Sequence, residues 1–121
     1  MVNFLSAHPT SKLPEYNNFI LENVNMTFLY LNSDKMGEGS SELGKKLLKS
    51  FLTELADSDV QIDVIGCVNS GINLTTEGSD VLDSLKKLEQ KGARIASCGT
   101  CLDFHDKRDS VLIGDIGTMK M

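Results

Sequence analysis

The fold is decided by Met26-Thr27-Phe28-Leu29-Tyr30-Leu31, a short and nearly continuous apolar run that is rich in β-forming residues. Because polar residues 32–34 close this run, it is typical of a strand that is buried on both faces. A helix is predicted next, because apolar residues recur at helical spacing and form one stripe. These residues are Leu43, Leu47, Leu48, Phe51, Leu52 and Leu55. Ser40 or Ser41 is suited to cap the start of this helix.

Strands and helices keep alternating along the rest of the chain. Further strands are predicted at residues 60–68, 93–97 and 111–113. A second helix is predicted between the first two of these, with Thr75 or Thr76 as its N-cap and Gly92 just after its end. Strands that are separated by helices indicate βαβ units. We therefore expect an α/β fold with a mostly parallel sheet of four to five strands that is flanked by helices.

Composition limits the class of protein. A length of 121 residues predicts one domain. The net charge of −5 gives an acidic surface that repels phosphate groups, so we expect no nucleic-acid partner. No apolar run approaches the length of about 20 residues that spans a bilayer, and residues 1–12 lack a signal-peptide pattern. We therefore expect a cytoplasmic protein without a membrane partner.

The first 25 residues differ from the remainder. They contain both prolines and a single compact apolar run, Phe19-Ile20-Leu21. We interpret residues 1–25 as an N-terminal arm or linker with one short strand or turn near residues 18–24. Residues 26–121 then form the α/β domain.

The three cysteines fall at or just past the carboxyl ends of predicted strands, where parallel sheets gather ligands and chemistry. A reducing cytoplasm favours a redox, carrier or metal role for them over a structural disulfide. Cys98 and Cys101 are spaced to open a short helix, whose free N–H groups and dipole stabilise a thiolate. Gly99 leaves room beside the sulfur. Cys98 is the expected nucleophile and Cys101 the expected resolving thiol, whereas the alternative is two small buried apolar residues.

Two further residues extend this hypothesis. Cys67 ends the second predicted strand and can face the pair across the sheet edge, although a core cysteine is the simpler interpretation. His105 is either an accessory proton donor or a solvated loop residue. The spacing Cys98-x₂-Cys101-x₃-His105, with Cys67 as a fourth ligand, suits zinc or iron–sulfur. A second C-x₂-C is missing from the sequence, so we expect no metal and no cofactor.

Glycine-rich and polar turns predict the wall of a cleft beside the cysteines. Its expected residues are Gly37, Gly39, Asn69, Ser70, Gly71, Gly99 and Thr100. The spacing Gly37-x-Gly39-x₄-Gly44 before a helix can cradle a phosphate. The alternative is a tight turn with close helix–sheet packing at Gly44, since the P-loop and dinucleotide patterns are both incomplete.

Five sequence blocks carry a resemblance to a known family. They are 34–39, 42–44, 69–71, 77–79 and, most specifically, Ser97-Cys98-Gly99-Thr100-Cys101-Leu102. In this order they resemble the DsrE-like domain of YedF-type sulfurtransferase-like proteins, which are associated by name with selenium metabolism. The resemblance covers about residues 26–119. It implies a DsrE/DsrF-like, flavodoxin-like three-layer fold and a homo-oligomer. It also implies a sulfur relay in which Cys98 carries sulfur as a persulfide.

The chain departs from this family pattern at both ends. Two-domain members carry an N-terminal TusA-like domain with a Cys-Pro motif, whereas residues 1–25 are too short for it and contain no cysteine. Separate donor and acceptor proteins with reactive cysteines are therefore expected, a TusA-like protein among them. Family members also continue beyond the position of Met121 with a helix and a strand. The domain is thus expected to be C-terminally short, and an exposed edge favours association with another chain.

The sequence supports one leading hypothesis, a sulfurtransferase or sulfur carrier that uses Cys98 and Cys101. Two alternatives stay open. One is a small-ligand-binding or assembly module with structural cysteines, and the other is a cysteine-based metal or redox module.

Overall fold

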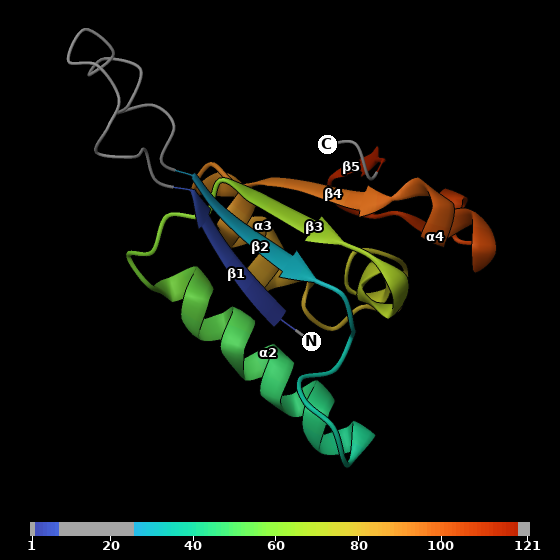
Figure 1. Cartoon of the computed structure of the whole chain (residues 1–121), viewed down its shortest axis with the longest axis horizontal. Helices are drawn as coiled ribbons and strands as arrows, with labels where there is room; N and C mark the ends of the chain where they lie inside the picture. The colour runs from blue at the N-terminus through green and yellow to red at the C-terminus, as the bar shows by residue number, and fades with distance from the viewer. Residues whose placement is uncertain (1, 8–25, 119–121) are drawn as a thin grey trace, which may run out of the picture.

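The computed structural model describes the backbone of residues 2–7 and the whole of residues 26–118. Five strands lie side by side in chain order: β1 (Val2–Ala7), β2 (Met26–Leu31), β3 (Val64–Cys67), β4 (Arg94–Cys98) and β5 (Asp115–Gly117) (Figure 1). β1 pairs antiparallel with β2, whereas β2 through β5 are parallel. The helices are α2 (Ser41–Asp57), α3 (Leu82–Gln90) and α4 (Gly99–Phe104), with 3₁₀ turns η2 (Asn69–Leu74) and η3 (Arg108–Ser110).

The predicted α/β class and mostly parallel sheet are confirmed. In β2, β3 and β4 the register aligns Leu29 with Ile65 and Ile95, and all three side chains are buried. Because side chains alternate along a strand, this row faces one side of the sheet. The buried leucines of both long helices join it in one core: Leu48, Leu52 and Leu55 of α2, and Leu85 and Leu88 of α3. The sheet and these helices form two layers of the predicted flavodoxin-like three-layer fold.

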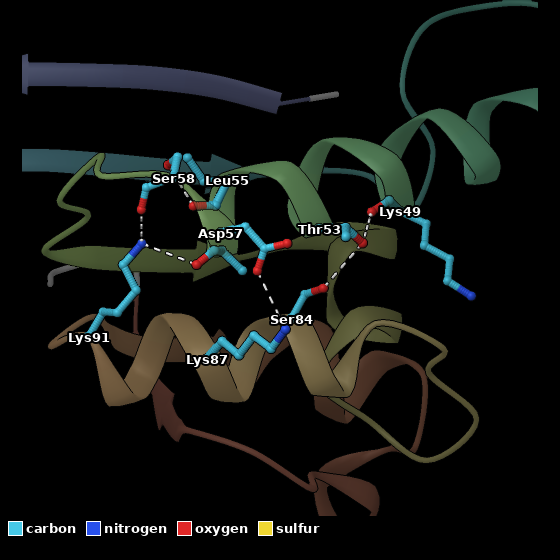
Figure 2. A network of polar contacts seen from close by, with 9 residues as sticks. Lys49, Thr53, Leu55, Asp57, Ser58, Ser84, Lys87 and Lys91 are labelled. Carbon is cyan, nitrogen blue, oxygen red and sulfur yellow. Dashed lines mark hydrogen bonds and ion pairs between the residues drawn. The ribbon is translucent and has the colours of Figure 1, made fainter.

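Polar contacts fasten α2 to α3 (Figure 2). The Lys91 ammonium donates to the carbonyl of Ser58 at 2.6 Å, just past the end of α2, where helix carbonyls carry partial negative charge. Lys87 pairs with Asp57 at 3.4 Å. Exposed pairs of this kind contribute little stability, so apolar burial provides most of the attachment.

The predicted helix ends are confirmed in part. The Ser40 hydroxyl accepts a hydrogen bond from the Leu43 N–H at 3.2 Å and caps α2. Gly92 follows the last residue of α3 by two positions, just after the C-cap Lys91, and has φ +109°, as a C-terminal glycine does. The predicted Thr75 or Thr76 cap is wrong. Both hydroxyls are buried and donate to the Ile72 carbonyl, and α3 begins later.

The predicted strand at 111–113 is also wrong. Val111 forms only an isolated antiparallel bridge with Thr76, and the last strand is β5. Gly114 makes the change of direction. Its φ is +79°, and a Cβ there would lie 2.5 Å from the Ile95 carbonyl oxygen, so only glycine lets the chain pass so close to β4. The other two predicted strands agree with β3 and β4 apart from their ends.

The N-terminal region departs from the predicted arm. Residues 2–7 belong to the sheet as β1, whereas the strand or turn expected near 18–24 lies outside the described residues. Within the described part of the chain, every helix is too short or too polar to cross a membrane.

Candidate functional site

The cysteine pair lies where β4 passes into α4. Cys98 is the last residue of β4 and the N-cap of α4, and Cys101 lies in the first turn of that helix. The predicted placement of this pair, after a strand and at the start of a short helix, is therefore observed. A hydrogen bond fixes the backbone just before the pair. It joins the buried Ser97 hydroxyl to the buried Thr75 hydroxyl on the core side of the sheet.

Cys98 is buried, with 7% of the residue exposed. Burial raises the pKa of the Cys98 thiol, but several hydrogen bonds to its sulfur outweigh this effect. The donors are the backbone N–H groups of Cys101 and Thr100 and the side chains of the same two residues. The net pKa is below its usual value of 9.0, so Cys98 is the member of the pair that ionises first.

Cys101 has the opposite character. Burial raises its pKa, and the neighbouring Cys98 raises it further through a hydrogen bond and negative charge. The Asn69 N–H opposes these effects by donating to the Cys101 sulfur at 3.1 Å. Asn69 has φ +52°, a conformation that asparagine tolerates better than most residues. The pair therefore consists of one thiolate former and one neutral thiol in direct contact.

A pocket of about 330 Å³ opens beside the pair and is lined by Asn69, Thr100, Cys101, Phe104 and His105. Phe104 is 84% exposed, and its ring meets the His105 ring edge-on at 5.0 Å. Cys98 is not among the described residues that line this pocket. Sequence reasoning missed Phe104, whose signal is a large apolar side chain within the charged stretch 103–109.

Cys67 does not join the site. It pairs in register with Ser97, so its side chain lies on the opposite face of the sheet from Cys98. It is fully buried in the core, and burial raises its pKa to about 12. The expectation that Cys67 faces the pair is wrong, and its interpretation as a core cysteine is confirmed. Among the described residues, three or more His, Cys, Asp or Glu side chains nowhere gather as metal ligands.

The residues that were expected to form one cleft wall lie in different places. Gly37 and Gly39 line a separate pocket of about 420 Å³ with Asn32, Ser33, Lys35, Glu38 and Ser41. Asn32 Oδ1 is buried beside this loop and has no hydrogen-bond partner among the described residues. Gly71 is not a wall residue, because a Cβ there would lie 2.0 Å from the Leu31 carbonyl oxygen. Gly44 packs closely against Lys35 and Met36 of the loop after β2, and not against the sheet as the alternative to a phosphate cradle predicts.

Side chains tie together the loops that follow three strands. The Ser70 hydroxyl accepts from the Asp34 N–H at 3.2 Å, and Asn73 donates to the Asp34 carboxylate at 2.9 Å. Lys107 donates to the Asn73 carbonyl oxygen in turn. η2 thus joins the loop after β2 to the segment after α4. Its first residue is Asn69, whose N–H donates to the Cys101 sulfur.

Arg108 lies over the start of α4. Its guanidinium donates two bonds to the Asp103 carboxylate, at 2.7 and 3.0 Å, and this pairing lowers the pKa of Asp103. A Cβ at Gly99 would lie 3.0 Å from the guanidinium and 3.3 Å from the Gly117 carbonyl oxygen. The absence of a side chain at Gly99 thus leaves room for Arg108 and Gly117, whereas the expectation that it makes room next to the sulfur stays a prediction.

Comparison with known proteins adds information on the fold. The chain resembles the solved structure of MTH1491, a protein of unknown function from Methanobacterium thermoautotrophicum. The TM-score is 0.50 at 22% sequence identity, over 74% of this chain and 78% of that one. Neither a family model nor a curated protein matches the sequence.

Proposed function

We propose that this protein is a sulfurtransferase-like sulfur carrier that holds sulfane sulfur as a persulfide on Cys98, with Cys101 as the second thiol of the relay. The observation that carries the proposal is the contact between two thiols of opposite character at the carboxyl edge of a parallel sheet. The resemblance to DsrE-like domains points to the same chemistry.

The site has the groups that a persulfide carrier needs. A thiolate is the nucleophile in sulfur transfer, and two N–H groups aimed at Cys98 stabilise that charge. The terminal sulfur of a persulfide is also anionic, so the same donors suit the loaded state. Burial of Cys98 slows the attack of small thiols on bound sulfur. The proposed partners are donor and acceptor proteins with reactive cysteines, and the protein is proposed to act as a homo-oligomer.

The test is uptake of sulfur by the reduced protein. Incubation with glutathione persulfide is expected to add the mass of one sulfur atom, which dithiothreitol removes and peptide mass spectrometry locates on Cys98. A Cys98→Ser/Cys101→Ser double variant is expected to gain none. Cys67→Ala, which alters only the core thiol, is the matched control and keeps the gain.

Other outcomes identify other functions. A loss of two hydrogens without added sulfur would show a dithiol redox pair. Equal uptake by the double variant, or no uptake by the folded wild type, would refute the carrier role. The alternative is then a small-ligand-binding module, which the unpartnered Asn32 Oδ1 beside the polar pocket favours.

A further inference from the structure

We infer that sulfur enters the pair at Cys101, through the pocket that Phe104 and His105 line, and passes from there to Cys98. This inference rests on the proposed carrier function and deepens it by assigning an order to the two thiols. The order is opposite to the usual expectation that the first cysteine of a C-x₂-C pair meets the partner.

The accessibility of the two sulfurs carries the argument. Cys101 is partly exposed and forms part of the pocket wall, whereas Cys98 is 7% exposed and is not among the described residues that line the pocket. A sulfur donor must bring its sulfane sulfur into line with the attacking thiol. The more accessible of the two thiols therefore reacts with the donor first. Cys98 is shielded, but it is in hydrogen-bond contact with Cys101. A donor therefore reaches Cys101 more readily than Cys98.

The pocket fits a donor of a particular chemistry. The exposed Phe104 ring provides an apolar surface next to Cys101, and the Asn69 N–H donates to the Cys101 sulfur. An isolated exposed aromatic is unremarkable, but one beside a thiol offers packing area to a protein segment. The pocket accordingly suits a donor that presents its persulfide next to an apolar group.

Both transfer steps balance without an oxidant. In the first, the Cys101 sulfur attacks the terminal sulfur of the donor persulfide while Cys98 accepts the Cys101 proton. The donor S–S bond breaks, the donor thiolate takes up that proton and leaves as a thiol, and Cys101 becomes the persulfide.

In the second step, the restored Cys98 thiolate attacks the terminal sulfur on Cys101. A new S–S bond forms on Cys98, the bond to Cys101 breaks, and the Cys101 thiolate keeps the electron pair. The Asn69 N–H, 3.1 Å from the Cys101 sulfur, stabilises that thiolate as it leaves.

The order is tested by the time course of loading with glutathione persulfide, followed by rapid quenching and peptide mass spectrometry. In the wild type, persulfide is expected on Cys101 first and to decay as Cys98 persulfide rises. Cys98→Ser is expected still to load Cys101, but more slowly than the wild type because the thiolate that accepts the Cys101 proton is lost, and to lose the sulfur faster to added dithiothreitol. Cys101→Ser is expected to load Cys98 more slowly by about an order of magnitude, because access limits the reaction.

The outcomes separate this inference from the function on which it rests. Immediate appearance of Cys98 persulfide, with Cys101→Ser as fast as the wild type, would overturn the order but leave the carrier role intact. No loading of the wild type would overturn both. Cys101→Ala is a second variant that guards against an effect specific to serine, and circular dichroism establishes that each variant is folded.

Discussion

Three identical side chains behave differently in this protein because of what surrounds each sulfur. Cys98 receives N–H donors at the start of α4, and its pKa falls. Burial and the neighbouring Cys98 together raise the pKa of Cys101. Cys67 is enclosed by leucines and isoleucines of the core, and its pKa rises to about 12. The pKa of each thiol thus depends on where the backbone places its sulfur.

Burial of Cys67 has a consequence for stability at alkaline pH. An unfolded thiol ionises near 9.0, whereas the folded one keeps its proton to about 12. Above about pH 9 the unfolded state binds fewer protons than the folded state, so the free energy of unfolding falls as pH rises. Cys67→Ala removes this dependence. Urea unfolding between about pH 8 and about pH 10.5 should show a wild-type decline that is steeper by about 1 kcal/mol per pH unit. Parallel curves would contradict the assigned burial effect.

The sequence was sufficient to find the cysteine pair but not its surroundings. Cys98 and Cys101 are close in sequence and follow a strand, so local pattern alone places them. The face on which Cys67 lies depends on strand register, and a shift of one residue moves a side chain to the other side of the sheet. The Asn69 contact depends on a positive φ in η2, which many polar turns do not adopt. Phe104 can be recognised as a site residue only from the pocket that it lines in the structure.

At the scale of elements, the start of α2 depends on a single hydroxyl. Ser40 caps the helix, whereas Ser41 is its first residue and is exposed. Ser40→Ala leaves the Leu43 N–H without this acceptor and is expected to lower the free energy of unfolding by about 1 kcal/mol. Ser41→Ala is the matched control, with little change expected because alanine favours a helix interior. Urea denaturation of both variants measures the difference, and equal effects would argue against the cap.

The last strand lies at a different position from the predicted one, because tertiary contacts override the local preference for strand structure. Val111-Leu112-Ile113 has the better strand composition, yet Asp115-Ile116-Gly117 pairs with β4. The Leu112 N–H donates to the Thr75 carbonyl at 2.8 Å, and Ile113 is buried in the core. These contacts fix 111–113 beside the loop after η2, and Gly114 then turns the chain toward the sheet. Contacts between segments that are distant in sequence determine the position of the last strand, so composition alone could not predict it.

At the scale of the whole molecule, a single core joins the sheet to both long helices. Leu52 is completely buried in α2, whereas Leu43 on the same helix is 55% exposed. Leu52→Ala is expected to reduce the free energy of unfolding by about 2–5 kcal/mol, because apolar contacts are lost and a cavity remains. Leu43→Ala, with the same chemical change, is expected to cost well under that. Thermal and urea unfolding compare the two, and similar losses would contradict the core as described.

The order of the strands bears on how the chain is made. Each strand from β2 onward lies beside the one that precedes it in sequence (Figure 1). A polypeptide that leaves the ribosome from its N-terminal end can therefore dock every new strand onto a finished neighbour, without waiting for a later segment to be inserted between them. Synthesis then completes β2, β3 and the two long helices before Cys98 and Cys101 emerge, and β5 docks beside β4 after them.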